Sequence, residues 1–249
     1  TASMPPAADA KQTLARNFER ALDALFMVYQ PIVDWSRRVP LGYEALVRSA
    51  ETSLPHPGAI FDAAEKLDRL HDLGAIIRDK SGEPLALTDP DDSLFVNLHT
   101  QDLLDPRLYD PEAPLSKIAA RVVLEITERA NIEKIADVQN CVDKLRALGF
   151  RIAIDDIGAG YSGLNTFALV QPDVLKLDIT LVRDIDTNVM KRKLVDTLLG
   201  LCTDLGITVI AEGVETPAER DTLVELGCNY LQGYLFARPG APFPEPRFG

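Results

Sequence analysis

The stretch RIAIDDIGAGYSGLNTFALVQPDVLKLD, residues 151–178, decides the fold class of this chain. It begins and ends with two short runs, RIAI and VLKL, whose residues are nearly all apolar, and a third such run, ITVIA, follows at residues 207–211. Strands that are buried on both faces belong to parallel sheets whose two faces are covered by helices. The stretch therefore predicts an α/β protein with a parallel sheet.

Strand-like runs of this kind extend over most of the 249 residues, with helical patterns between most of them. Roughly eight strands in a chain of about 250 residues match a TIM-like (β/α) barrel. Only residues 34–41 join the first two strands, too few for a helical crossover, so we expect an antiparallel pair and an irregular start to the barrel. The strands are expected to begin near Phe26, Gly42, Leu94, Val122, Arg151, Val174, Ile207 and Tyr230.

The chain is predicted to contain one main domain. We expect residues 1–20 to form an N-terminal linker, a helix or a non-native addition, and residues 21–249 to form the domain, without internal repeats. The last helix has clear end signals in TPAERDTLVELG: Thr216 is predicted as its N-cap, and Glu219 completes a capping box. Gly227 is expected to end this helix.

Six of the predicted strands end in a charged or amide side chain that the apolar pattern does not require. Such a group at the end of a buried strand is costly unless it is paired or bound to a metal. Because the carboxyl ends of barrel strands face one common mouth, these side chains should gather there. They are Glu44, Asn97, Glu125, Asp155, Asp156, Lys176 and Glu212.

Oxygen ligands in this number suit Mg²⁺ or Mn²⁺ better than zinc or copper. Two adjacent carboxylates are typical of sites where a pair of metals hydrolyses a phosphoester. The residues alone therefore predict a metal-dependent hydrolase or lyase that acts on a phosphorylated substrate. The prediction for Asp156 depends on a bend in the chain. Neighbouring residues of a strand point to opposite faces, so Asp156 reaches the site only if the chain bends after Asp155.

Charge and composition exclude some functions. The net charge of −12 argues against non-specific binding to nucleic-acid polymers or to anionic membranes. No apolar stretch approaches the roughly 18 residues that suggest a membrane span. The three cysteines lie far apart and show no zinc-site spacing, which predicts reduced thiols in a cytoplasmic protein.

The motifs, taken in their order along the chain, resemble a known family. GYEALVR carries the signature Glu44-Ala45-Leu46 that gives the EAL-domain cyclic di-GMP phosphodiesterases their name. The resemblance runs from about Met27 to Pro239. The motifs that carry it are YQPI, GYEALVR, FVNL, LEITE, DDIGAGYSGL, LKLD, AEGVE and LQGYLFARP.

The resemblance implies hydrolysis of one phosphodiester of cyclic di-GMP to linear pGpG, with two divalent cations, Mg²⁺ or Mn²⁺. It implies catalytic roles for Glu44, Lys176 and Glu212, the last as general base or second-metal ligand. The implied metal ligands are Glu44, Asn97, Glu125, Asp155, Asp156 and Glu212. The implied substrate contacts are Gln30, Leu46, Arg48 (to a phosphate), Gln232, Phe236 (to a guanine face) and Pro239. Glu128 and Glu215 are implied as supports of the loop DDIGAGYSGL.

The resemblance also implies partners and a location. It favours a homodimer that forms through the face near the DDIGAGYSGL loop, and an upstream sensor or GGDEF-type domain in a longer protein. It places the domain in the cytoplasm, alone or as the intracellular part of a larger signalling protein.

Three other interpretations compete with an active phosphodiesterase. The chain could be a catalytically silent receptor or scaffold for cyclic di-GMP, or an unrelated metal-dependent barrel lyase. Gly158, Gly160 and Gly163 also match the dinucleotide-binding pattern GxGxxG after a strand. Asp155 and Asp156 stand directly before that turn and would repel a pyrophosphate, which argues against the third interpretation.

Overall fold

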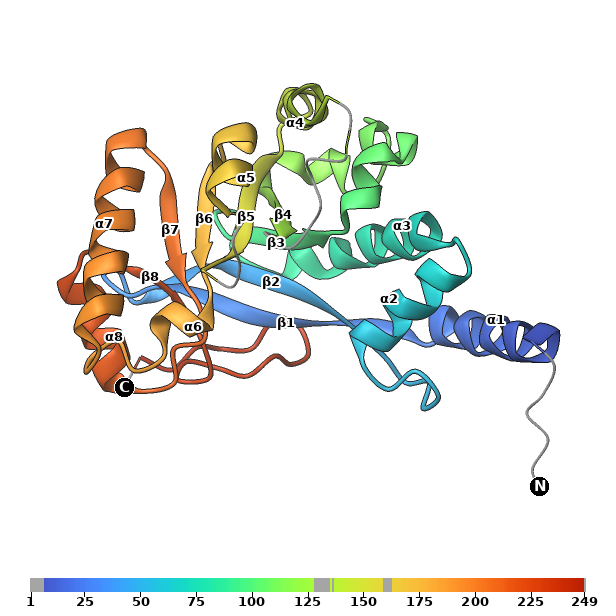
Figure 1. Cartoon of the computed structure of the whole chain (residues 1–249), viewed down its shortest axis with the longest axis horizontal. Helices are drawn as coiled ribbons and strands as arrows, with labels where there is room; N and C mark the ends of the chain where they lie inside the picture. Colours follow the sequence, from blue (N-terminus) through green and yellow to red (C-terminus); the bar gives the residue numbers. More distant parts are fainter. Residues whose placement is uncertain (1–6, 128–134, 136, 159–162, 249) are drawn as a thin grey trace.

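The structure is a computed structural model that describes residues 7–127, 135, 137–158 and 163–248. Within these residues, eight strands form a closed barrel in sequence order (Figure 1). The predicted barrel is thus confirmed. The strands are β1 (Leu25–Asp34), β2 (Val39–Ser49), β3 (Ser93–Leu98), β4 (Val122–Thr127), β5 (Arg151–Ile157), β6 (Val174–Leu177), β7 (Thr208–Ala211) and β8 (Tyr230–Gln232).

The start of the barrel is irregular, as predicted. β1 pairs antiparallel with β2 on one side and antiparallel with β8 on the other, whereas the remaining neighbours pair in parallel. Only residues 35–38 separate β1 from β2, which permits a hairpin and excludes a helical crossover. β1 therefore closes the barrel in the opposite direction to the other strands.

Helices cover the outside of the barrel between the parallel strands (Figure 1). The capping box predicted for the last helix is present: the Thr216 side chain accepts a hydrogen bond from the Glu219 N–H, and the Glu219 carboxylate accepts one from the Thr216 N–H. The α-helices are α1 (Ala7–Asp23), α2 (Pro57–Lys66), α3 (Leu70–Ser81), α4 (Val138–Ala147), α5 (Gly163–Val170), α6 (Ile179–Val182), α7 (Val189–Leu205) and α8 (Pro217–Glu225). The 3-10 helices are η1 (Glu83–Leu87), η2 (Thr100–Leu104), η3 (Pro106–Tyr109) and η4 (Ser116–Arg121).

The hydrophobic core has separate inner and outer parts. One buried cluster fills the barrel, with residues from β1, β3, β4, β5, β6 and β7, and a larger one lies between the sheet and the helices. Side chains alternate between these two environments along each strand, which explains why the strand sequences are apolar on both faces. The inner cluster consists of Ile32, Phe95, Val123, Ala153, Val174 and Ile210.

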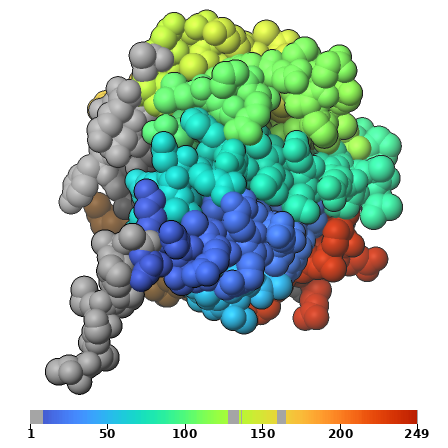
Figure 2. Space-filling view, turned by 90° about the vertical axis from the view of Figure 1, so that its right-hand side faces the viewer, coloured from blue at the N-terminus to red at the C-terminus, as the bar shows by residue number. Residues whose placement is uncertain are grey.

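A third cluster attaches the N-terminal helix to the barrel. Phe18, Ala21 and Leu22 of α1 are buried against α2 and α3. Figure 1 places α1 and α2 at the end of the molecule opposite α7 and α8, and Figure 2 shows the blue residues of α1 lying against the blue-green surface that follows them in sequence. The domain boundary at residue 20 stays a prediction. No described helix is long and apolar enough to cross a membrane.

The contact between β2 and β3 leads to a prediction about Gly42. A Cβ at Gly42 would lie 2.0 Å from the backbone oxygen of Ser93, its partner on β3. We expect Gly42→Ala to lower the free energy of unfolding by at least about 1–3 kcal/mol, the usual cost of overpacking a core. Urea unfolding of the two proteins measures the difference.

Gly200 provides the matched control, because a Cβ there would meet nothing within 4 Å. Gly200→Ala should leave stability unchanged or raise it by up to about 1 kcal/mol, since alanine favours a helix interior. A Gly42→Ala protein as stable as Gly200→Ala would contradict the close approach of the two strands.

Candidate active site

The strand register places the predicted polar side chains on the inner face at one end of the barrel. Gln30 on β1 lies opposite Glu44 on β2, and Asn97 on β3 lies opposite Glu125 on β4. Gln232 joins the same face from β8. Residues that are distant in sequence therefore become neighbours because they lie at matching register positions of adjacent strands. Glu44 lies within β2 and not at its end as predicted.

Glu44 is held by amide groups from both sides. Asn97 Nδ2 donates to Glu44 Oε1 at 2.8 Å, and Gln232 Nε2 donates to Glu44 Oε2 at 2.7 Å. Gln232 also donates to Gln30 Oε1 at 3.3 Å, and Gln30 Nε2 donates to the backbone oxygen of Ala237 at 3.1 Å. This chain of hydrogen bonds fixes the orientation of the Glu44 carboxylate.

Lys176 lies at the centre of the site, and its side chain is fully buried. Its Nζ is 2.5 Å from Glu212 Oε1 and 2.6 Å from Glu125 Oε1. Asp155 Oδ1 lies at 3.5 Å and Glu44 Oε2 at 3.6 Å. One ammonium group thus contacts four carboxylates, each from a different strand or strand end.

The burial of these carboxylates changes their acidity. Burial raises the pKa of Glu125 well above its usual value, in spite of the Lys176 charge, and repulsion from the other carboxylates adds to the effect. Burial likewise raises the pKa of Asp155, and it raises the pKa of Glu212 to about 8. A cluster with more buried negative charge than positive charge favours protons or cations.

Glu44 behaves differently from the other carboxylates. Burial alone would raise its pKa, but the Lys176 charge and the hydrogen bonds from Gln232 and Asn97 outweigh burial, so the pKa lies below its usual value. Glu44 therefore favours its ionised form more strongly than the other carboxyl groups of the cluster do.

The bend that Asp156 requires is present. The pairing of β5 with β6 shifts between Ile154 and Ile157, and Asp156 has a positive φ of 62°. This local break turns the Asp156 side chain toward the same region as Asp155. Carboxylate oxygens of Asp155, Asp156 and Glu212 lie within 4.8 Å of one another.

A pocket of about 460 Å³ opens above this cluster. Four predicted residues, Glu44, Asp156, Glu212 and Gln232, form part of its wall, and Lys176 and Glu125 lie buried beside them. The full lining is Gln30, Glu44, Leu46, Asp156, Asp178, Ile179, Glu212, Gly213, Glu215, Gln232, Gly233 and Tyr234.

The structure divides the predicted substrate contacts into two groups. Gln30, Leu46 and Gln232 line the pocket. Arg48 and Pro239 are not among the residues that line it, and the Arg48 guanidinium donates to the backbone oxygen of Val47 at 2.8 Å.

The prediction for Phe236 needs correction. Only 1% of Phe236 is exposed, and its ring packs 6.1 Å from the ring of Trp35 in the core between sheet and helices. It is therefore not available to a ligand. The aromatic residue at the pocket is Tyr234, which is 49% exposed and carries the Arg238 guanidinium 4.2 Å from its ring centre.

Two residues of the pocket wall, Tyr234 and the exposed apolar Ile179, were not predicted from the sequence. The signal for Tyr234 was its position in the motif LQGYLFARP, directly after Gln232-Gly233. It lies in the turn that follows β8. No comparable signal marked Ile179. Its side chain lies over Gly213, where a Cβ would come within 2.5 Å of it, so the contact depends on tertiary structure.

Of the two residues predicted to support the loop, Glu215 and Glu128, the structure describes only Glu215. Glu215 lines the pocket, pairs with Arg183 at 3.0 Å, and donates its backbone N–H to Glu219 Oε2 at 2.9 Å. Glu128 lies outside the described residues, as does part of the loop DDIGAGYSGL.

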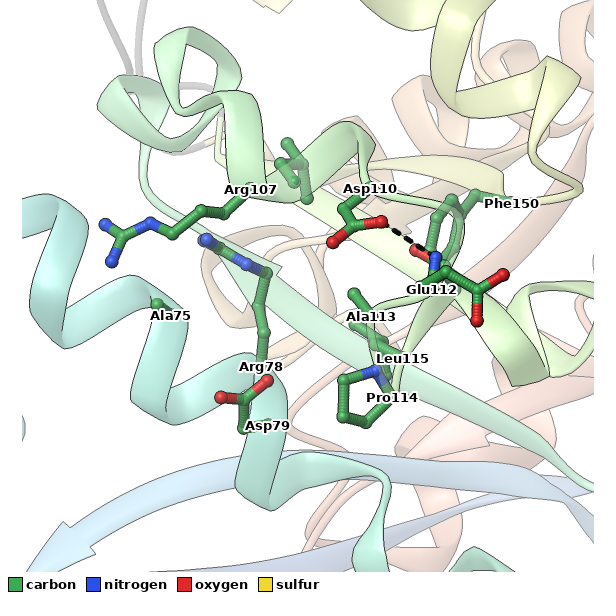
Figure 3. Close-up of a pocket in the computed structure, with 12 residues that line it drawn as sticks. Ala75, Arg78, Asp79, Arg107, Asp110, Glu112, Ala113, Pro114, Leu115 and Phe150 are labelled. Atoms are coloured by element: carbon green, nitrogen blue, oxygen red, sulfur yellow. Dashed lines mark hydrogen bonds between the residues drawn. The ribbon is translucent and has the colours of Figure 1, made fainter.

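A second hollow, of about 300 Å³, lies outside the barrel near α3 and η3 (Figure 3). The Arg78 and Arg107 side chains extend along one side of it, and Asp110 accepts a hydrogen bond from the Glu112 N–H on another. No predicted site residue lines this hollow. The Arg78 charge is already balanced by buried aspartates of η2 and its neighbourhood. We therefore assign the chemistry to the barrel pocket.

The donor set of the barrel pocket fits divalent cations. Glu125 Oε2 and Gln232 Oε1 are buried without a hydrogen-bond partner, and buried polar atoms of this kind are costly unless a cation or water binds them. Carboxylate and amide oxygens are hard ligands that suit Mg²⁺, Mn²⁺ or Ca²⁺. Fold and site together define a (β/α) barrel with an acidic centre whose oxygen ligands could hold a cation.

Comparison with known proteins identifies the family. The EAL domain family model matches residues 12–239, and the chain belongs to this family. It is 36% identical over 241 residues to the probable cyclic di-GMP phosphodiesterase PdeI of Escherichia coli K12, covering 91% of this chain and 30% of that protein. It is 29% identical to the signaling protein YkoW of Bacillus subtilis, covering 93% of this chain and 31% of that protein. The chain thus spans less than a third of these curated relatives.

Solved structures agree with this assignment. The manganese and cyclic di-GMP complex of BlrP1 from Klebsiella pneumoniae superposes with a TM-score of 0.74 at 33% identity, over 87% of this chain and 56% of that chain. The cyclic di-GMP complex of the PaMucR phosphodiesterase gives a TM-score of 0.80 at 28% identity, over 92% of this chain and 98% of that chain.

The placement of the two aromatic residues leads to a stability prediction. Phe236→Ala should lower the free energy of unfolding by about 3–5 kcal/mol, because it removes a fully buried ring from the core. Tyr234→Ala should cost less than about 1 kcal/mol, since the ring is half exposed. Urea unfolding of both variants measures the contrast, and equal losses would contradict this assignment of core and pocket residues.

Proposed function

We propose that this chain hydrolyses one phosphodiester of cyclic di-GMP to linear pGpG, with the help of two divalent cations, Mg²⁺ or Mn²⁺. The carboxylate cluster beneath the 460 Å³ pocket carries the proposal, because it can hold cations next to a bound phosphate. Membership of the EAL domain family and the names of its relatives support the choice of substrate.

The cations would be held by Glu44, Asn97, Glu125, Asp155, Asp156 and Glu212. Bound there, they would supply charge neutralisation for the phosphodiester, a more acidic water and stabilisation of the leaving oxygen. The protein's own contribution is position: amide groups orient Glu44, and the bend at Asp156 adds a ligand to Asp155 and Glu212. Lys176 adds a fixed positive charge beside the scissile phosphate.

Glu212 could act as a cation ligand or as the general base. Burial raises its pKa to about 8, so without cations it holds a proton at neutral pH and cannot accept one. A neighbouring divalent cation favours the ionised form of a carboxyl group. Both roles of Glu212, as cation ligand and as general base, therefore depend on cation binding.

The pocket wall suggests how the substrate is held. Gln30, Leu46 and Gln232 are proposed to contact the dinucleotide, and Tyr234 takes the guanine-stacking role that was predicted for Phe236. Aromatic rings stack on bases with about 1–3 kcal/mol per base. Arg48 and Pro239 stay predicted contacts that lie beyond the described pocket lining.

Two alternatives differ from this proposal in their chemistry. A silent receptor for cyclic di-GMP would bind the dinucleotide without cleaving it, and a barrel lyase would not bind it. The presence of all six predicted cation ligands favours an active enzyme over a silent receptor.

The proposal extends to the assembly and its location. We propose a cytoplasmic homodimer that forms near the loop DDIGAGYSGL, within a longer protein that carries an upstream sensor or GGDEF-type domain. The free cysteines support a reducing compartment, and the greater length of the relatives supports further domains. An apolar strip on α7 supports contact with a second copy, because Met190, Leu194, Leu201 and Leu205 recur on one helix face and are 42–78% exposed.

A single assay separates the three functions. The protein is incubated with cyclic di-GMP and Mg²⁺ or Mn²⁺, and both dinucleotide binding and pGpG formation are followed. We expect binding and pGpG. Binding without product would favour the receptor, and neither result, in protein shown to bind metal, would favour the lyase.

Loss of a cluster carboxylate should abolish most of the activity. Glu44→Ala and Glu212→Ala are each expected to reduce turnover at least ~10²-fold, because each removes a cation ligand or a base. Glu225→Ala, which removes an exposed carboxylate on α8, is the control and should retain full activity. Rates near wild type for either cluster variant would remove that residue from the mechanism.

A further inference from the structure

Carboxyl groups outnumber positively charged groups around Lys176. Three buried carboxylates and the partly buried Glu212 surround a single ammonium group, and among the described residues these four form ion pairs with no other lysine, arginine or histidine. Burying unpaired charge is costly. Among the described residues, the Lys176 ammonium is therefore the positive charge that these four carboxylates share.

The position of Lys176 resembles that of a shared cation. Its Nζ reaches Glu125 on β4 and Glu212 after β7, as well as Glu44 on β2 and Asp155 on β5. These contacts lie between 2.5 and 3.6 Å and come from opposite sides of the barrel. The residue itself is fixed in the middle of β6, where it pairs with Ile210 of β7.

The contacts depend on charge more than on direction. The ammonium group has three N–H donors but lies within 3.6 Å of four carboxylates, so hydrogen bonds alone cannot account for all four contacts. An ammonium group that is held mainly by Coulomb attraction competes directly with any other cation for the same oxygens. Two like charges a few ångströms apart in a protein interior repel by several kcal/mol.

We propose that the Lys176 ammonium is a resident cation of this site, which holds the carboxylates together before divalent ions bind and lowers the affinity with which those ions bind. The inference rests on the proposed function in one respect only, that divalent cations occupy this cluster. Its consequence is regulatory: the site keeps its shape in the absence of metal, and the repulsion keeps bound metal exchangeable.

The test removes the positive charge of Lys176 and keeps a side chain of similar size. The 249-residue chain with Lys176→Met and the same chain without the substitution are freed of metal with a chelator. Both are then titrated with MnCl₂ by calorimetry. The variant should bind Mn²⁺ at least about tenfold more tightly, because the nearest repelling charge is gone. Its melting temperature without metal should fall by at least about 5 °C and should rise more on Mn²⁺ addition than that of wild type.

Lys193→Met is the matched control, since Lys193 is exposed on α7 and the substitution changes the net charge equally. It should leave both Mn²⁺ affinity and melting temperature unchanged. Equal or weaker Mn²⁺ binding by Lys176→Met would overturn the proposal, as would a metal-free melting temperature equal to that of wild type.

A second variant decides the matter if Lys176→Met fails to fold with or without Mn²⁺. Lys176→Met combined with Glu125→Gln removes both charges of the 2.6 Å pair and restores the net charge of the cluster. This double variant should recover most of the metal-free melting temperature, since neutral replacement of a buried ion pair is tolerated far better than loss of one partner. A double variant that is as unstable as the single one would also overturn the proposal. Neither measurement uses cyclic di-GMP, so a failure here is distinguishable from a failure to hydrolyse the dinucleotide.

Discussion

The contact of the buried Lys176 ammonium group with four carboxylates is the interaction on which the site depends. Carboxylates brought this close inside a barrel would repel one another, and burial would force protons onto them. The positive charge reduces both costs, and amide groups from β3 and β8 orient Glu44 within the same cluster. The remaining excess of negative charge is what makes the cluster attractive to divalent cations.

The fold supplies this arrangement through strand register. Neighbouring barrel strands hold residues of matching register at one end of the barrel. The strands β2 to β6 and the residue that follows β7 therefore bring together Glu44, Asn97, Glu125, Asp155, Lys176 and Glu212. The antiparallel β1–β2 hairpin does not disturb this geometry, since Gln30 and Glu44 still face each other across the pair. The irregular strand thus adds Gln30 to the site.

Local breaks in regular structure complete the site. Asp155 and Asp156 would point to opposite faces in a regular strand, and the register shift after Ile154 brings them together. The wall above them is formed by the segments that follow the strands: Ile179, the first residue of α6, lies over Gly213, and Tyr234 lies in the turn after β8. The rigid barrel floor therefore holds the charged groups, and these segments shape the surface that a ligand meets.

The sequence by itself determined the barrel, the antiparallel start, the capping box of α8 and the polar residues of the barrel strands. These follow from local signals: apolar runs, the length of a link, and side chains whose burial would be too costly without a partner. Only the tertiary structure decided which aromatic residue faces the pocket, because Phe236 and Tyr234 lie two positions apart and differ only in what packs against them. It also decided that Lys176 balances four carboxylates at once, since that depends on distances between strands that sequence patterns do not specify.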